Sequence, residues 1–129
     1  MTSAAVYGTG SWGTAYASVL ADAGTSVTMW GRRQEVVDQI NAGTNEDYLP
    51  ELRLPSTIRA TTDPFEAAAG ADIVVLAVPS QTLRANLEVW GSALPSSAAI
   101  VSLMKGVELG TTRRMSEVIS EVGGVEPER

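Results

Sequence analysis

Short apolar runs alternate with amphipathic stretches along most of the chain. The clearest run, DIVVLAV at residues 72–78, is β-branched and continuously apolar, which is typical of a strand buried on both faces. Further strands are predicted at 4–7, 25–30, 57–61 and 98–103. Strand and helix alternate about five times, which predicts an α/β fold with helices covering both faces of a parallel sheet.

The stretches between the strands repeat apolar residues every three or four positions, which predicts helices. They lie at 11–23, 32–43, 63–71, after Pro79, and at 111–122. The apolar positions are Ala15, Val19, Leu20 and Ala23 in the first, Val36, Val37 and Ile40 in the second, Leu83, Leu87, Trp90 and Leu94 after Pro79, and Met115, Val118, Ile119 and Val122 in the last. Residues 43–55, rich in turn formers, predict a long loop, and such loops are often functional.

A glycine-rich turn joins the first strand to the first helix. Gly8, Gly10 and Gly13 form a G-x-G-x-x-G between a predicted strand and a predicted helix, the context in which this motif binds a dinucleotide. The first glycine permits the turn, the second lets a pyrophosphate approach the backbone, and the third lets helix and strand pack closely. The sequence therefore predicts a Rossmann-type doubly wound parallel sheet in three layers (αβα) that binds a coenzyme.

The end of the second strand distinguishes between the two nicotinamide coenzymes. NAD-binding domains usually place an acidic residue there to bind the ribose 2′-hydroxyl, but this chain has Arg32 and Arg33 and no acid between Val27 and Gln34. A guanidinium suits the dianionic 2′-phosphate of NADP. The residues favour NADP, with NAD as the alternative.

Composition removes several kinds of chemistry. The chain has no histidine and no cysteine, which excludes a histidine base, a thiolate nucleophile and His/Cys zinc chemistry, and no metal site is predicted. The net charge of −6 disfavours nucleic acid as a partner. No apolar run is long enough to insert in a membrane, and no signal peptide is evident, so a cytoplasmic protein is expected. Lys105 is the only lysine.

Several motifs occur in a characteristic order: GTGSWGTA at 8–15, NEDYLP at 45–50, ADIVVLAVPSQTLR at 71–84 and SLMKGVELGTTRRMSEVI at 102–119. From Ala4 to about Glu121, the chain resembles the N-terminal coenzyme domain of bacterial NAD(P)-dependent glycerol-3-phosphate dehydrogenase. The resemblance implies an oxidoreductase that interconverts dihydroxyacetone phosphate and sn-glycerol 3-phosphate with NAD(P)H, a small-molecule reaction of lipid metabolism that feeds phospholipid biosynthesis.

The resemblance also implies a division of labour between domains. Residues 1–129 are expected to be the N-terminal NAD(P)-binding Rossmann domain, with a C-terminal helical substrate domain absent from this chain. That domain would supply the lysine that acts as general acid and base, so no catalytic residue is expected here. The chain alone is expected to bind coenzyme without turnover. A homodimer is a possible assembly of the full-length protein.

The same resemblance assigns site residues. Ser11 and Trp12 would contact the coenzyme within the glycine turn, Arg32 and Arg33 would lie at the 2′-phosphate, and Tyr48 would approach from the long loop. Pro79 to Gln81 of the VPSQ segment would lie where the nicotinamide half passes, and Lys105 would touch both coenzyme and substrate. Lys105 also follows a predicted strand at its carboxyl end, where open parallel sheets bind ligands, so its ammonium could hold a phosphate or polarise a carbonyl.

Two alternatives remain open at this point. One is another NADP-dependent reductase of the same architecture, such as a ketopantoate reductase or a 3-hydroxyacid dehydrogenase. The other is a non-catalytic dinucleotide-sensing module, which would make no use of Lys105. Other polar residues are not assigned to the site: Glu108 is expected on a solvated turn, and Arg113 and Arg114 on the outer face of the last helix, with a phosphate contact left open.

Overall fold

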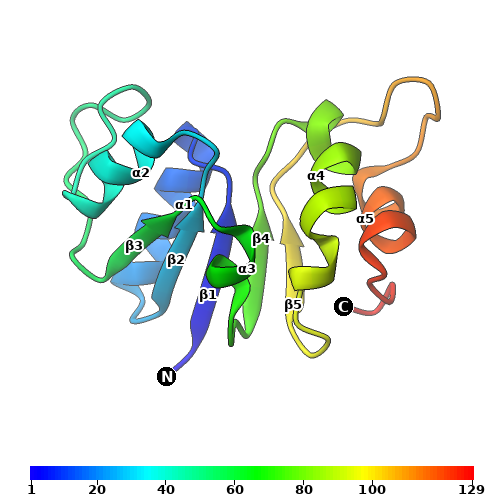
Figure 1. The fold of residues 1–129 in the computed structure, drawn as a ribbon, viewed down its shortest axis with the longest axis horizontal. Helices are drawn as coiled ribbons and strands as arrows, with labels where there is room; N and C mark the ends of the chain where they lie inside the picture. The colour runs from blue at the N-terminus through cyan, green and yellow to red at the C-terminus, as the bar shows by residue number, and fades with distance from the viewer.

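The computed structural model describes all 129 residues, Met1–Arg129. Five strands and five α-helices alternate along the chain (Figure 1). The strands are β1 (Ser3–Tyr7), β2 (Ser26–Trp30), β3 (Ile58–Thr61), β4 (Ile73–Leu76) and β5 (Ala99–Ser102). The helices are α1 (Ser11–Asp22), α2 (Gln34–Asn41), α3 (Pro64–Ala68), α4 (Leu83–Trp90) and α5 (Met115–Gly123), with short 3₁₀ turns η1 (Ser80–Thr82) and η2 (Gly91–Ala93) on either side of α4.

The strands form one parallel sheet in the order β3-β2-β1-β4-β5. Val6 at the centre of the sheet lies beside Met29 of β2 on one side and Val75 of β4 on the other. The chain moves outward from β1 to β3 and then returns to the other side of β1 with β4, so the strand order reverses at β1 and β4. This is the Rossmann-type arrangement, and the fold prediction is confirmed.

Helices cover both faces of the sheet, because each strand alternates its side chains between them. On one face, Val6, Val27 and Met29 pack with α1 and α2 in a cluster of 9 buried residues. On the other face, a cluster of 17 buried residues joins Tyr7 and Leu76 of the sheet to α3, α4 and α5. The second, larger layer of helices is the one that carries the aromatic core.

The buried face of α1 differs from the apolar pattern of the sequence. Thr14, Ala17 and Ser18 are buried, whereas Val19 is 64% exposed. The reason is close approach: a β-carbon added at Gly13 would lie 2.5 Å from the carbonyl oxygen of Gly8. Where α1 lies this near the sheet only small side chains fit, while Tyr16 and Leu20 pack at the edge of the contact and Val19 faces outward.

Two helix boundaries also differ from the prediction. Helix α4 ends at Trp90, and Leu94 follows η2 instead of continuing the helix. Helix α5 begins at Met115, because Arg114 has an extended backbone and its N–H donates to the Glu117 side chain in a capping box. Arg113 and Arg114 therefore precede α5 and do not lie on its outer face.

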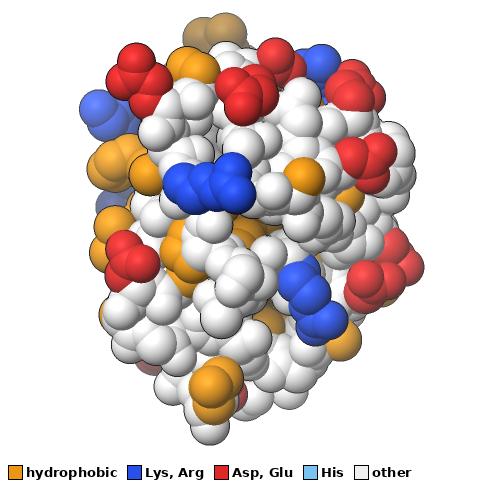
Figure 2. All heavy atoms as spheres, turned by 90° about the vertical axis from the view of Figure 1, so that its left-hand side faces the viewer, with side chains coloured by type: hydrophobic (Ala, Val, Ile, Leu, Met, Phe, Trp, Pro, Cys, Tyr) orange, Lys and Arg blue, Asp and Glu red, His pale blue; other side chains and the backbone are white.

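Charged side chains of both signs lie on the side of the molecule formed by α2, β3 and the 43–55 loop (Figure 2). Acidic groups gather along the upper and right edges of this view, with basic and apolar groups between them. No helix combines the length and apolar character needed to cross a membrane. No group of three or more acidic side chains is arranged to hold a metal ion.

Candidate functional site

A cleft of about 690 Å³ opens at the carboxyl ends of the central strands. Its walls are the glycine turn 8–13, the segment 30–33 after β2, the segment 77–79 after β4, the exposed face of α4 and Tyr48 from the long loop. This is the edge at which the strand order reverses, where open parallel sheets bind ligands, and the volume is in the range of small-molecule sites.

The structure brings nearly all of the predicted coenzyme residues together. The cleft is lined by Gly8, Gly10, Ser11, Trp12, Gly13, Arg32, Arg33, Tyr48 and Pro79. Lys105 is exposed on the loop after β5 and is not among the lining residues. Four lining residues of α4 and the turn before it were not predicted: Thr82, Ala85, Asn86 and Val89. No sequence signal marks them, since they are ordinary surface residues of a helix until the fold places them over the cleft.

The glycine turn is shaped by close backbone contacts. Gly8 has φ +125°, its N–H donates to the Trp30 carbonyl at 2.9 Å, and a β-carbon there would collide with the Ala77 carbonyl. Around Gly10, by contrast, nothing lies within 4 Å of where a β-carbon would be. Gly8 and Gly13 are thus required by packing, while Gly10 leaves open space on the cleft side.

The start of α1 presents unpaired backbone donors to this space. Gly10 is the N-cap, and the first helical hydrogen bond runs from Thr14 N–H to the Gly10 carbonyl at 3.0 Å. The N–H groups of Ser11, Trp12 and Gly13 come before that bond and have no intrahelical acceptor. No side chain caps them, and the helix dipole adds positive potential, so the turn can bind an anion.

The long loop is attached to the glycine turn by polar side chains. Asn45 is fully buried, and its Nδ2 donates to the Thr9 carbonyl and to Thr14 Oγ1, both at 2.9 Å. Ser11 Oγ donates to the Tyr48 carbonyl at 3.0 Å. These bonds place Tyr48 at the cleft. Asn45 was missed in the sequence, where an asparagine in a turn-rich loop gives no sign that it will be buried.

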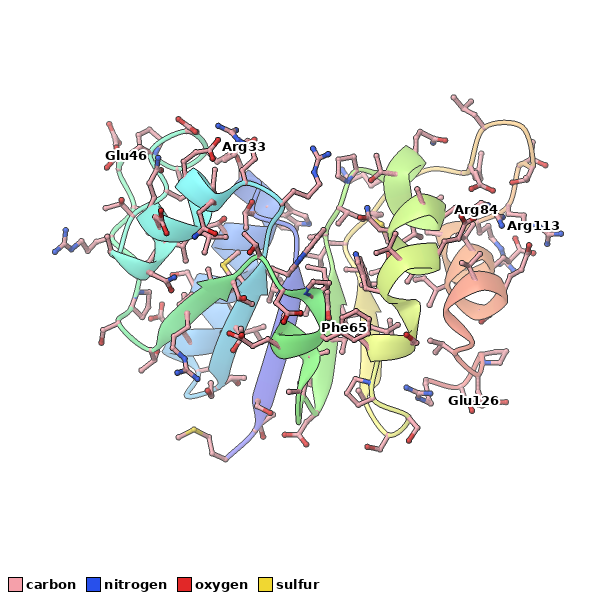
Figure 3. All side chains as sticks on the ribbon, in the orientation of Figure 1. Arg33, Glu46, Phe65, Arg84, Arg113 and Glu126 are labelled. Atoms are coloured by element: carbon pink, nitrogen blue, oxygen red, sulfur yellow. The ribbon has the colours of Figure 1, made fainter.

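The two arginines after β2 have different surroundings. Arg33 pairs with Glu35 at 2.7 Å and lies 3.7 Å from Asp47, and the Arg33–Glu35 hydrogen bond raises the pKa of the guanidinium and lowers that of the carboxyl. Figure 3 shows Arg33 at the start of α2. Arg32 lines the same wall, is exposed, and forms no ion pair. Arg32 is therefore the uncompensated positive charge at this wall.

An aromatic cluster supports the floor of the cleft. Trp30 lines the cleft and packs against Tyr7 and Trp90, whose rings stack with centroids 4.1 Å apart. The Tyr7 hydroxyl donates to the Pro64 carbonyl, and burial raises the pKa of Tyr7. Trp90 is 1% exposed, so its predicted apolar position in the helix after Pro79 is a core position.

Glu108 is buried, contrary to the expectation of a solvated turn. It is 9% exposed, and Arg84 donates to both of its carboxylate oxygens at 3.0 Å. The hydrogen bonds from Arg84 hold the pKa of the Glu108 carboxyl below its usual value. The sequence gives no sign of this pairing, because the two residues are 24 positions apart.

A second groove of about 600 Å³ runs between β5 and α5 and contains none of the predicted site residues. Its walls include Ser102, Arg113, Glu121 and Glu126. The end of the chain lies along the same edge, where Ile100 N–H donates to the Arg129 carbonyl at 2.9 Å. The cleft at the glycine turn is the one that combines the fold's ligand-binding edge with free backbone donors.

The strand order and the glycine turn at its reversal point define a Rossmann-type dinucleotide-binding class of domain. Within that class, residues 3–128 match the family described as "NAD-dependent glycerol-3-phosphate dehydrogenase N-terminus". The chain belongs to this family. The resemblance found in the sequence is confirmed, and the alternative reductase families are set aside.

Individual relatives agree with this assignment. The glycerol-3-phosphate dehydrogenase [NAD(P)+] of Streptomyces avermitilis is 60% identical over 127 residues, which are 98% of this chain and 38% of the relative. The crystal structure of glycerol-3-phosphate dehydrogenase from Coxiella burnetii has a TM-score of 0.86 at 31% identity, covering 95% of this chain and 38% of that one. The yeast enzyme from Saccharomyces cerevisiae gives 0.86 at 28% identity, over 98% and 40%. The chain thus spans well under half the length of these proteins.

Proposed function

We propose that this chain binds NAD(P)H and forms the coenzyme-binding part of an enzyme that interconverts dihydroxyacetone phosphate and sn-glycerol 3-phosphate in the cytoplasm. The observation that carries the proposal is the cleft itself, in which nine residues of the expected coenzyme site meet at the ligand-binding edge of the sheet. Family membership and relatives named for this activity support the choice of substrate.

The residues present fit a dinucleotide. The N–H groups of Ser11, Trp12 and Gly13 would bind the pyrophosphate, which would approach over the open side of Gly10. Arg32 would face the 2′-phosphate of NADP, with Arg33 held back by Glu35. When bound, the coenzyme supplies hydride chemistry, and the chain's residues bind and orient it.

The other end of the dinucleotide would run toward β4. Pro79 lies after this strand and lines the cleft, so the nicotinamide half is proposed to pass there. Lys105 stands on the loop after β5, at the same edge of the sheet. Its ammonium is proposed to contact coenzyme and the phosphate of the substrate, while the general acid and base would come from elsewhere in the whole enzyme.

A parallel titration with NADPH and NADH tests the proposal. Trp12 and Trp30 line the cleft, so bound coenzyme should quench their emission and accept energy from them. We expect saturable quenching by both coenzymes, with tighter binding of NADPH because Arg32 is uncompensated. A chain that leaves its tryptophan emission unchanged at millimolar coenzyme would contradict the proposal.

A further inference from the structure

The loop from Lys105 to Arg114 is held in place by polar contacts and not by burial of apolar side chains. Of these ten residues only Glu108 is buried, and the loop's larger apolar side chains, Val107 and Leu109, are 46% and 80% exposed. The loop therefore gains little from the hydrophobic core. Its position depends on polar contacts made from outside the loop.

Those contacts come from two residues that follow Pro79. Gln81 pairs with the backbone on both sides of Glu108: its Nε2 donates to the Val107 carbonyl at 3.0 Å, and Leu109 N–H donates to its Oε1 at 2.9 Å. Arg84 binds the Glu108 side chain through two parallel bonds of 3.0 Å each. Thr111 Oγ1 adds a third donor to the same carboxylate at 2.6 Å. We call Gln81, Arg84 and Glu108 the loop clamp.

Glu121 of α5 and Arg113 from the segment before α5 support the clamp. Arg84 Nη1 lies 3.4 Å from Glu121, which Arg113 also approaches at 2.9 Å. Figure 3 shows Arg84 and Arg113 close together, one from α4 and the other from the segment before α5. A bidentate pair with a carboxylate that is only 12% exposed fixes geometry much more firmly than an ordinary surface ion pair.

The clamp joins the wall of the cleft to the loop that carries Lys105. Pro79 and Thr82, which line the cleft, flank Gln81 in the chain. Lys105 lies three positions before Glu108 on the clamped loop, and Gly106 between them has φ +92°. The cleft wall and the only lysine are thus connected through one set of side-chain contacts.

We propose that Gln81, Arg84 and Glu108 are positioning residues that hold Lys105 in register with the nicotinamide end of the cleft. The clamp couples the position of Lys105 to the cleft wall, because Gln81 lies within the 79–82 segment and Arg84 lies in α4 directly after it. This rests on the proposed function, in which the cleft binds NADPH.

The single lysine provides a direct probe. Reductive methylation with ¹³C-formaldehyde gives one lysine side-chain signal in NMR spectra, distinct from that of the amino terminus. In the unaltered chain we expect NADPH to shift this signal. Arg84→Met and Glu108→Gln should abolish the shift, while NADPH still quenches tryptophan, since the glycine turn is untouched. Arg114→Met is the matched control: it removes an arginine of the same loop that pairs with Glu117 and not with Glu108.

Hydrogen exchange tests the clamp without coenzyme. Backbone amides of 105–114 should exchange faster in Arg84→Met and Glu108→Gln than in the unaltered chain or in Arg114→Met. Gln81→Leu, a change at an exposed position, should show the same effect even where the charged variants fold poorly. Unchanged exchange in the clamp variants, or a full NADPH-induced lysine shift in them, would overturn the proposal.

The two proposals fail in different ways. If NADPH quenches tryptophan in every variant but shifts the lysine signal equally in all of them, the coenzyme site stands and the positioning role is wrong. If NADPH affects neither signal in the unaltered chain, the proposed function is wrong, and so is the proposed coupling between the cleft and Lys105. The exchange rates then still decide whether the clamp orders the loop.

Discussion

The three glycines of the turn between β1 and α1 are needed for different physical reasons. Gly8 has a positive φ, and a β-carbon there would collide with the Ala77 carbonyl oxygen. A β-carbon added at Gly13 would lie 2.5 Å from the carbonyl oxygen of Gly8, because α1 approaches the turn so closely. Gly10 has neither constraint. The motif therefore combines two residues that the fold requires with one that only a ligand would require.

Alanine substitutions separate these demands. Gly13→Ala should destabilise the chain by about 1–3 kcal/mol, because the new methyl group overpacks the helix–strand contact. Gly10→Ala should leave the free energy of unfolding nearly unchanged and weaken NADPH binding strongly, because the methyl group occupies the approach to the helix N-terminus. Urea unfolding and fluorescence titration measure the two effects. Normal NADPH affinity in Gly10→Ala would place the pyrophosphate elsewhere.

Asn45 and Asn41 offer a matched pair of asparagines. Asn45 donates to Thr9 and Thr14 beneath the turn, whereas Asn41 exchanges hydrogen bonds of 3.0 and 2.8 Å with the backbone of Ala60. Alanine at either position should cost about 1–3 kcal/mol of stability. Only Asn45→Ala should also weaken NADPH binding, because it releases the Tyr48 loop from the turn. Equal NADPH affinities in the two variants would show that the loop has no part in binding.

The two adjacent arginines should differ in their effect on coenzyme preference. Arg32→Ala removes an uncompensated charge and should lower NADPH affinity about tenfold, the equivalent of one charge-assisted hydrogen bond, with little effect on NADH. Arg33→Ala should have a smaller effect, because Glu35 already occupies that guanidinium. Parallel titrations of both variants with both coenzymes measure this. Loss of NADPH preference in Arg33→Ala alone would reverse the assignment.

At the scale of elements, the helices show how well the spacing of apolar residues predicts the bounds and the buried face of a helix. In α2, the predicted Val36, Val37 and Ile40 are the buried residues. In α1, the pattern predicted the helix but not its buried face, because contact with the sheet selected small residues. The segment 111–114 has helix-compatible residues but forms a turn, with Thr112 at φ 56° and the Arg114 cap starting α5.

The link between α4 and the loop before α5 should make stability depend on pH. Arg84 lowers the pKa of Glu108, so the ionised carboxylate stabilises the fold at pH values above its unfolded pKa. That contribution is lost as the pH falls through the lowered folded value. Glu108→Gln should therefore have a lower Tm than the unaltered chain at neutral pH.

The difference in Tm between the two proteins should narrow at acid pH. Other glutamates with lowered pKa values, such as Glu117 and Glu126, remain in both proteins and cancel in the comparison. Thermal unfolding followed by circular dichroism from neutral to acid pH measures the difference. A constant difference in Tm across this range would mean that the ion pair contributes nothing that depends on its charge.

At the scale of the whole molecule, the chain forms one five-stranded sheet with helices on both faces and spans 38% of the length of its Streptomyces avermitilis relative. The cleft holds residues suited to a coenzyme, and its lining contains no histidine, lysine, aspartate or glutamate. Binding and turnover are thus expected to separate in this chain.

We expect the purified chain to bind NADPH without oxidising it when dihydroxyacetone phosphate is added. The physical reason is that hydride transfer to a carbonyl also needs a proton donor, and the general acid is proposed to come from elsewhere in the whole enzyme. Absorbance of NADPH at saturating coenzyme measures turnover, and the fluorescence titration serves as the control for binding. Steady oxidation dependent on dihydroxyacetone phosphate would show that these residues suffice for catalysis.

The sequence by itself determined the α/β class, the order of elements, the glycine turn and half of the 18 residues that line the cleft. The fold features follow from local patterns: β-branched runs form buried strands, and glycines at fixed spacing form one kind of turn. Cleft residues outside the glycines and the arginines came from the family resemblance of the motifs. The tertiary structure alone decided the burial of Asn45 and Glu108, the buried face of α1 and the different surroundings of Arg32 and Arg33. Each of these depends on partners distant in the chain or on how closely two elements approach, which no local pattern encodes.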